Sequence, residues 1–339
     1  MTPQEIAGLM AELEQPAYRA DQIFGWLHKQ HATTFAAMEN LPLSLRSKLE
    51  ENCRIPTVTP VEKLVSNRDG TIKFLSETHD STFIESVLMS YKHGNSICIS
   101  TQAGCRMGCK FCASAETGLE RNLTAGEYCA QVYNATDVKG IVLMGCGEPL
   151  DNYDATLRFI ELITHPKGMN IGQRHITLST CGLVPEILKL AEEKLQITLA
   201  ISLHASDDDT RQVLMPIAKK YPIKELIPAC RNYAEKTRRR LTFEYALTKG
   251  INSSPSHALA LAKLLKGLLC HVNLIPINKA RGGFSPTPRK EIEAFANILE
   301  ENRIPSTIRR SLGSDVNAAC GQLRATSKYF THIFQQEDL

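Results

Sequence analysis

Three closely spaced cysteines are the residues of this chain best suited to metal chemistry. Cys105, Cys109 and Cys112 form a C-x3-C-x2-C pattern in the stretch 98–112, which also contains Cys98. Four cysteines normally hold a four-iron cluster, so three thiolates on one tight loop would leave one iron open to a small molecule. We therefore interpret the pattern as the ligand set of a [4Fe-4S] cluster.

Two other uses of these cysteines stay open on spacing alone. A C-x2-C pair is typical of a zinc site or of a redox-active dithiol. A structural zinc ion takes four close ligands, and no cysteine or histidine lies between Cys112 and Cys129. The missing fourth ligand favours the cluster over zinc.

The composition limits the class of protein. The chain has 339 residues, 43% hydrophobic and 22% charged, which suits a soluble globular protein with one α/β barrel and an appendage. A formal net charge of +3 permits a nucleic-acid partner without requiring one. Eleven cysteines without a secretory segment indicate a reducing compartment, and no apolar run reaches membrane-spanning length. We expect a cytoplasmic protein with no membrane attachment.

A repeated strand–helix pattern must position the cysteines. Short runs rich in β-branched residues alternate with amphipathic stretches, as in βα units. Six runs cover 96–100, 141–145, 175–180, 197–203, 241–247 and 271–277, and a further strand is expected at 306–310. Because near-continuous apolar strands that alternate with helices form parallel sheets, the sequence predicts an α/β fold with a partial (β/α)6 barrel.

The remaining segments suggest four parts in all. Residues 1–54 carry three helical patterns and form a small N-terminal helical domain, which either packs against the barrel or binds substrate. Residues 55–95 read as a short β extension and linker, in which Glu85 lies on a strand. A glutamate on a strand face is most often solvated. The barrel then spans 96–305, and a C-terminal strand and cysteine loop span 306–339.

Polar and small residues follow several of the predicted strands. In parallel α/β folds, ligands bind at the carboxyl ends of the strands. The candidates are Gly147, Glu148, Ser179, Ser202, Leu203, His204 and Asn278. Each one alone would usually be an ordinary turn residue, but together they predict a ligand site beside the cysteine loop. Glu148 can accept hydrogen bonds from an ammonium group.

At this point the sequence resembles a known family. The cysteine spacing resembles the radical S-adenosylmethionine (SAM) superfamily, and the longer motifs resemble the adenine-C2 RNA methyltransferases of the RlmN/Cfr family. The matching pieces are Cys98 ahead of the cysteine loop, Arg121-Asn122-Leu123-Thr124, Gly147-Glu148-Pro149-Leu150, Ile176-Thr177-Leu178-Ser179-Thr180, Ser202-Leu203-His204-Ala205, Asn273-Leu274-Ile275-Pro276 and the Cys320 loop. The N-terminal helices, Gly168-Met169-Asn170 and His175 favour the RlmN branch. One departure is Cys146, where the family usually has methionine.

The resemblance implies the cofactors and the residues that hold them. Cys105, Cys109 and Cys112 would bind a [4Fe-4S] cluster, whose open iron chelates SAM. Residues around the Gly-Glu-Pro motif would bind the SAM amino group, and the other strand ends would bind the rest of SAM. The implied SAM-binding residues are Gly147, Glu148, Ser179, Ser202, Leu203, His204 and Asn278. Two SAM molecules would be used per turnover.

The resemblance also implies a mechanism and partners. Cys320 would take a methyl group from one SAM, and radical cleavage of a second SAM would convert it into a methylene radical that adds to adenine C2. Cys98 would resolve the adduct through a disulfide with Cys320, with Glu85 as a proton acceptor. The expected substrates are adenosine 2503 of 23S rRNA and adenosine 37 of some tRNAs. The expected electron donor is a flavodoxin or a ferredoxin, and the protein is expected to be a monomer. Basic candidates for RNA contact are Arg238–Arg240, Lys279, Arg281, Arg309 and Arg310.

Two rival functions differ in what they require of the cysteines. A radical SAM enzyme that uses SAM only as an oxidant would not need both Cys98 and Cys320. A non-catalytic RNA-binding or redox-sensing protein would need no cluster at all.

Overall fold

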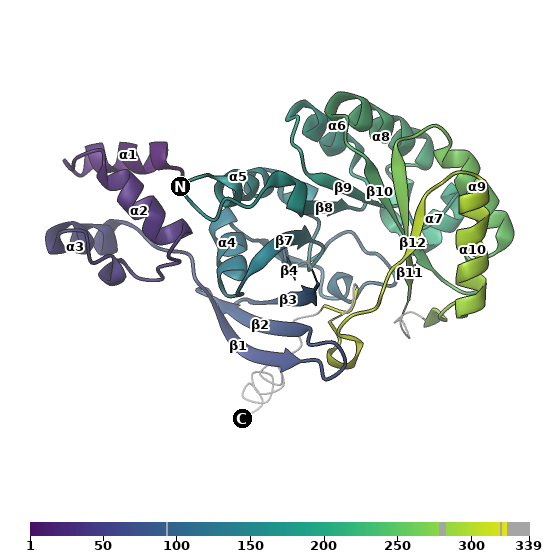
Figure 1. Ribbon diagram of the computed structural model, residues 1–339, viewed down its shortest axis with the longest axis horizontal. Coiled ribbons are helices and arrows are strands. Elements are labelled where there is room, and N and C mark those ends of the chain that lie inside the picture. Colours follow the sequence, from purple (N-terminus) through teal and green to yellow (C-terminus); the bar gives the residue numbers. More distant parts are fainter. Residues whose placement is uncertain (93, 278–282, 319–320, 324–339) are drawn as a thin grey trace.

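Three short helices form a module that projects from one end of the protein (Figure 1). The computed structural model describes residues 1–92, 94–277, 283–318 and 321–323. The helices are α1 (Pro3–Glu12), α2 (Arg19–His28) and α3 (Leu43–Asn52). Thr2 and Glu5 form a capping box at the start of α1, with Pro3 in the first turn, so the first helix begins where its sequence signals predict. Apolar faces, including those of Met10, Phe24 and Leu45, are buried in the core of the protein.

One ten-stranded sheet runs through the rest of the chain in the order β1-β2-β3-β4-β7-β8-β9-β10-β11-β12. Its strands are β1 (Val58–Val65), β2 (Ile72–Thr78), β3 (Phe83–Tyr91), β4 (Gly94–Cys98), β7 (Val138–Leu143), β8 (Ile176–Thr180), β9 (Thr198–Ser202), β10 (Leu241–Leu247), β11 (Cys270–Pro276) and β12 (Ser306–Ile308). The first four strands pair antiparallel, and every pairing from β4 to β12 is parallel. The antiparallel strands are therefore continuous with the barrel sheet.

Helices cover the outer face of the parallel strands (Figure 1). They are α4 (Ala125–Tyr133), α5 (Tyr153–Thr164), α6 (Val184–Glu192), α7 (Asp208–Leu214), α8 (Ile223–Thr237), α9 (Pro255–Leu265) and α10 (Arg289–Glu301). Aliphatic side chains such as Ile141, Leu178 and Leu199 are fully buried in the core. The predicted α/β fold with its six parallel barrel strands is confirmed, and β12 extends the sheet by one strand.

Two elements of the cysteine region do not show in the sequence pattern. A small hairpin of β5 (Gln102–Gly104) and β6 (Leu119–Asn122) brackets the cysteine loop. Helix α7 adds a short turn of structure between β9 and α8. Within the part of the chain that is described, no helix has the length and apolar character needed to cross a membrane.

Candidate active site

A cavity of about 400 Å³ opens at the carboxyl ends of the parallel strands. Its size falls in the usual range for small-molecule sites. Predicted site residues that line it are Cys98, Cys105, Cys109, Cys112, Gly147, Glu148, Ser179, Ser202 and His204. Residues at or after the ends of four parallel strands, β4, β7, β8 and β9, thus meet at one place, as the parallel fold predicts.

The cysteine loop is held by backbone hydrogen bonds at its base. The Cys105 N–H donates to the Gly118 carbonyl at 2.8 Å, and the Cys112 N–H donates to the Cys109 carbonyl at 3.1 Å. Gly104 has a positive φ of +73°, and a Cβ there would collide with the Gly118 backbone. The hairpin can close beneath the loop because residue 104 is glycine.

The spacing of the sulfurs distinguishes between the possible metal centres. Sulfurs bound to one tetrahedral zinc ion lie about 3.8 Å apart, since each Zn–S bond is about 2.3 Å. No three cysteine sulfurs of the described chain lie within 4.8 Å of one another. The three thiols are therefore not gathered around one point as a single tetrahedral zinc ion would hold them.

The thiols also need a positive charge nearby to ionise. Burial, the Glu148 carboxylate and the neighbouring thiols raise the pKa of Cys105 to about 12. Burial and the same neighbours raise the pKa of Cys109 still further. Three close thiolates become stable only when a cationic centre binds them, so the donor set itself fits a metal cluster.

Glu148 is a buried carboxylate fixed by the backbone. Its Oε2 accepts from the Cys181 N–H at 2.7 Å and its Oε1 accepts from the Leu150 N–H at 3.1 Å. Its own N–H donates to the side-chain carbonyl of Gln102 at 2.8 Å. Burial raises the pKa of Glu148, although these hydrogen bonds oppose the effect. An ammonium group bound in the cavity would offset the cost of burying this charge.

The two glycines before Glu148 allow close packing against the start of the cysteine region. A Cβ on Gly145 would lie 2.5 Å from the Ile99 carbonyl oxygen. Gly147 has φ of +103°, and a Cβ there would lie 2.7 Å from the backbone nitrogen of Gln102. The Gly-Cys-Gly-Glu-Pro loop thus needs its glycines to contact the chain that leads into the cluster loop, as well as to line the cavity.

The ends of β8 and β9 supply polar groups to the cavity. Ser179 and Ser202 line it, whereas Leu203 is fully buried and its N–H bonds the Glu244 carbonyl. His204 accepts a hydrogen bond at Nδ1 from the Ala246 N–H at 3.0 Å, and burial lowers the pKa of His204 to about 3. The imidazole is therefore neutral, with its proton on Nε2.

Glu85 forms an ion pair with a residue that lines the cavity. It is only 3% exposed, so the solvated position expected for a strand-face glutamate is wrong. Its Oε1 lies 2.9 Å from the Nζ of Lys73, which lines the cavity. Lys73 gives no sequence signal of its own, because its partner lies on another strand twelve positions away.

The C-terminal segment closes one side of the cavity. Leu312, Val316, Ala318 and Leu323 pack with Val87, Met89 and Cys98. The Gly321 carbonyl accepts from the Ala113 N–H at 2.8 Å, directly after Cys112. Ala318 and Gly321 line the cavity on either side of positions 319 and 320. Cys320 and Asn278 themselves lie outside the described residues, as do Lys279 and Arg281.

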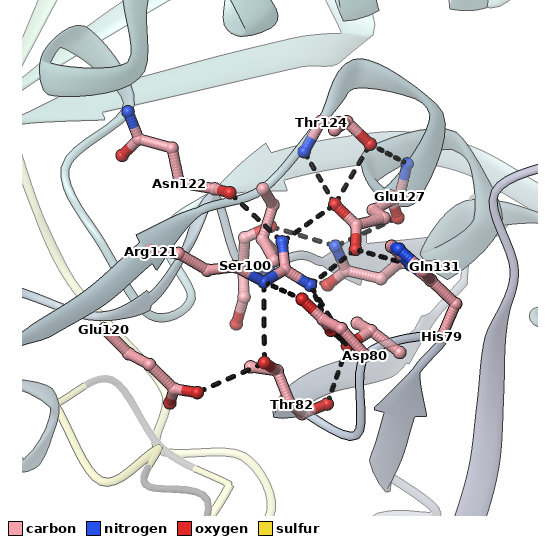
Figure 2. A network of polar contacts seen from close by, with 12 residues as sticks. His79, Asp80, Thr82, Ser100, Glu120, Arg121, Asn122, Thr124, Glu127 and Gln131 are labelled. Carbon is pink, nitrogen blue, oxygen red and sulfur yellow. Dashed lines mark hydrogen bonds and ion pairs between the residues drawn. The ribbon is translucent and has the colours of Figure 1, made fainter.

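The Arg-Asn-Leu-Thr motif has a structural role that the sequence did not indicate. Figure 2 shows the Arg121 guanidinium at the centre of a polar network, with bonds to Glu127 at 2.7 and 3.1 Å and to Asp80 at 2.8 Å. Glu127 also caps α4 by accepting from the Thr124 N–H. The side chains of His79, Asp80 and Glu127 have metal-ligand atoms within 4.8 Å of one another, but the guanidinium already neutralises both carboxylates. The network ties the β2–β3 turn to α4 behind the cysteine loop.

A partial parallel barrel that opens onto a loop with three cysteines places this protein in the radical SAM class. Residues 99–262 match the profile of the radical SAM superfamily, and residues 1–55 match that of the ribosomal RNA large subunit methyltransferase N-terminal domain. The structure is similar to the crystal structure of a radical SAM methyltransferase from Sphaerobacter thermophilus, with a TM-score of 0.92 and 47% identity over 96% of this chain and 98% of that chain.

Curated relatives narrow the class further. The chain is 53% identical over 329 residues to a probable dual-specificity RNA methyltransferase RlmN of Clostridium novyi, covering 95% of this chain and 96% of the relative. It is 51% identical to the protein of the same name from Clostridium perfringens, covering 95% of both. The chain belongs to the RlmN family of radical SAM RNA methyltransferases.

Proposed function

We propose that this enzyme methylates carbon 2 of adenosine in RNA, with adenosine 2503 of 23S rRNA and adenosine 37 of some tRNAs as substrates. The observation that carries the proposal is the shared cavity, which Cys98, the cysteine loop and both described flanks of Cys320 line together with Lys73, the ion-pair partner of Glu85. The dual-specificity names of the relatives support two kinds of RNA substrate.

The chemistry of the target explains why two further cysteines are needed. Adenine C2 lies between two ring nitrogens and is electron-poor, so it does not attack the methyl group of SAM as a nucleophile. Cys320 first takes a methyl group from one SAM, which requires its thiolate form. When bound, the reduced cluster and a second SAM supply the radical chemistry that activates this methyl group for addition to C2. The reaction therefore uses two SAM molecules per turnover.

Cys98 and Glu85 complete the reaction on the RNA adduct. Glu85 accepts the C2 proton as a carboxylate, and the unpaired electron that the radical addition leaves on the ring would pass to the oxidised cluster. The Cys98 thiolate then attacks the sulfur of residue 320 and the S–CH2 bond breaks. A disulfide forms, and a proton from solvent completes the methyl group of the released base. Cellular thiols reduce this disulfide before the next turnover. Cys98 is 6% exposed, which protects the thiol from other reactions.

The cavity residues have separate roles in binding SAM. Cys105, Cys109 and Cys112 hold the cluster, and Glu148 with Gly147 receives the SAM amino group. Ser179, Ser202, the Leu203 backbone, His204 and Asn278 bind the carboxylate, ribose and adenine. Among the basic candidates that the structure describes, Arg309 and Arg310 line the same cavity, which supports a contact of both with RNA at the reacting base.

The accessory parts follow from the same proposal. Residues 1–54 form an RNA-binding accessory domain, 55–95 a β extension, 96–305 the barrel and 306–339 the strand and loop that carry Cys320. The enzyme works as a cytoplasmic monomer with a flavodoxin or ferredoxin as electron donor. The target base must be unstacked, because C2 lies inside a helical stack.

Digestion and mass spectrometry of RNA test this function. Cluster-loaded protein, SAM and reductant should convert the target adenosines of 23S rRNA and tRNA fragments to 2-methyladenosine. Cys320→Ala should form none, and Cys98→Ala should accumulate a covalent protein–RNA adduct. Methylation at carbon 8, or full activity of Cys320→Ala, would contradict the proposal.

A further inference from the structure

Lys73 contributes a buried ammonium group to the candidate active site. Its side chain is 10% exposed, and its Nζ lies 2.9 Å from Oε1 of Glu85, whose side chain is 3% exposed. Lys73 also lines the cavity. A lysine is seldom buried unless it is paired, so this position calls for an explanation beyond surface charge.

The strand register explains how the pair reaches the cavity. Lys73 on β2 lies opposite Val87 on β3, and Val87 lies opposite Cys98 on β4. Residues directly opposite one another share a face of the sheet, and so do residues two apart on one strand. Lys73, Glu85 and Cys98 therefore project from the same face, which the C-terminal segment covers.

Other ionisable groups lie near the Lys73–Glu85 pair or line the same cavity. Cys98 on β4 lies on the same face of the sheet, and Cys146 interacts with Glu85 from the loop after β7, where burial raises the pKa of Cys146 to about 11. From the C-terminal strand region, Arg309 and Arg310 line the cavity, and Arg309 lies 4.0 Å from Glu244. Among the described residues Lys73 provides the cation in ion-pair contact with Glu85.

A proton acceptor must be ionised before it can act. A carboxylate as buried as Glu85 is driven towards its protonated form by desolvation. An ammonium group at hydrogen-bond distance reverses this effect and also fixes the direction of the carboxylate. The ion pair with Lys73 thus favours the ionised carboxylate that Glu85 needs as a proton acceptor in the proposed reaction.

We propose that Lys73 is a positioning residue for removal of the C2 proton, which holds Glu85 ionised and fixes its carboxylate beside the cavity. The inference rests on the proposed function, because it concerns one step of that reaction. The proton moves from C2 to a Glu85 carboxylate oxygen, and Lys73 takes no part in the transfer itself. Loss of Lys73 should therefore slow resolution of the protein–RNA adduct while earlier steps continue.

The test compares Lys73→Met with Lys73→Arg in cluster-loaded enzyme. Lys73→Met should methylate Cys320 as the parent does, accumulate the protein–RNA adduct, and form product at least tenfold more slowly at pH 7. The pH of half-maximal product formation should rise by about one to three units, the usual effect of losing an opposite charge beside a carboxylate. Lys73→Arg should stay within about threefold of the parent, because it retains the charge.

Three controls separate this role from a merely structural one. Glu85→Gln should also accumulate adduct, but higher pH should not rescue it, because an amide does not ionise. Lys139→Met removes an exposed lysine paired with the exposed Asp137 and should leave the activity unchanged. If Lys73→Met fails to fold, Lys73→Gln provides the same comparison, since it keeps a hydrogen-bond donor without the charge.

The outcomes that overturn the inference differ from those that overturn the function. An unchanged pH profile in Lys73→Met, or parallel loss of Cys320 methylation and product at every pH, would show that Lys73 has no such role. If the parent enzyme forms neither S-methylcysteine nor 2-methyladenosine, the proposed function itself fails and the inference fails with it.

Discussion

Replacing Arg121 by Met should destabilise the protein by about 3 kcal/mol, because it leaves a buried carboxylate without its main counter-charge. The Glu127 side chain is fully buried, and Arg121 contacts both of its carboxylate oxygens, at 2.7 and 3.1 Å. The Thr124 N–H at 2.7 Å would still bind one oxygen in the variant. This remaining bond places the cost near the lower end of the 3–5 kcal/mol that is usual for breaking a buried ion pair.

A double variant separates the buried charge from simple loss of contacts. In Arg121→Met/Glu127→Gln no charge is left buried, so the total cost should fall to about 1–2 kcal/mol. Arg289→Met removes an exposed ion pair with Glu293 on α10 and should change the free energy of unfolding by no more than about 0.5 kcal/mol. Urea unfolding of the cluster-loaded proteins, followed by circular dichroism without oxygen, measures all three.

The pH dependence of the free energy of unfolding tests the Arg121–Glu127 ion pair independently. Although burial opposes ionisation, Arg121 and the start of α4 hold the pKa of Glu127 below its ordinary value. Hydrogen bonds from Thr78 and Arg121 likewise lower the pKa of Asp80. Groups with lowered pKa stabilise the fold above their unfolded values near 4, and this stabilisation is lost as the pH falls. The deficit of Arg121→Met should therefore shrink below pH 4. A deficit under 1 kcal/mol at pH 7, or one that grows on acidification, would refute this reasoning.

Three further predictions concern the cavity and the N-terminal module. Glu148→Gln should weaken SAM binding by about 1.5–3 kcal/mol, which is the usual contribution of a hydrogen bond to a charged group, and should leave the iron content unchanged. Isothermal titration of the cluster-loaded protein with SAM checks this, and an unchanged affinity would exclude Glu148 from the SAM site. Gly147→Ala should prevent stable folding or cluster loading, because residue 147 has a φ of +103° and a Cβ there would meet Gln102. The control Gly8→Ala on α1 has open space around the new Cβ and should be neutral or stabilising. Iron content and melting temperature compare the two variants, and equal values for both would contradict the packing described. Burial lowers the pKa of His28 to about 4. Between about pH 6.5, the pKa of an unfolded histidine, and about pH 4, the unfolded chain binds one more proton than the folded protein, so the free energy of unfolding should fall by about 1.4 kcal/mol per pH unit. His28→Phe should flatten this pH dependence, and an identical slope in both proteins would show that His28 does not cause it.

The sequence predicts best what depends on local pattern. The parallel strands were predictable because each is a short apolar run followed by an amphipathic helix. The cysteine loop could be singled out as a candidate site because its three cysteines lie within eight residues. The position of the antiparallel strands was only partly predictable. Local pattern indicates β1 to β3, but it does not reveal that β3 pairs with β4 and so places Glu85 on the same face of the sheet as Cys98.

Interactions between distant segments account for what the sequence did not reveal. Lys73 becomes buried only because β2 and β3 pair in one register. Gln102 holds the Glu148 backbone across 46 positions, and Gln131 bonds both the N–H and the carbonyl of Ser100 across 31 positions. Glutamine and lysine are usually exposed, so composition gives no reason to single them out.

The central claim is that the methyl carbon reaches adenine as a methylene group carried by Cys320. Cluster-loaded enzyme should be given RNA and SAM whose methyl group carries three deuterium atoms, and the product nucleoside should be weighed by mass spectrometry. The account predicts 2-methyladenosine with two deuterium atoms, because one is removed when the methyl group is activated and solvent supplies its replacement. Product that retains all three deuterium atoms would mean direct methyl transfer and would contradict the account.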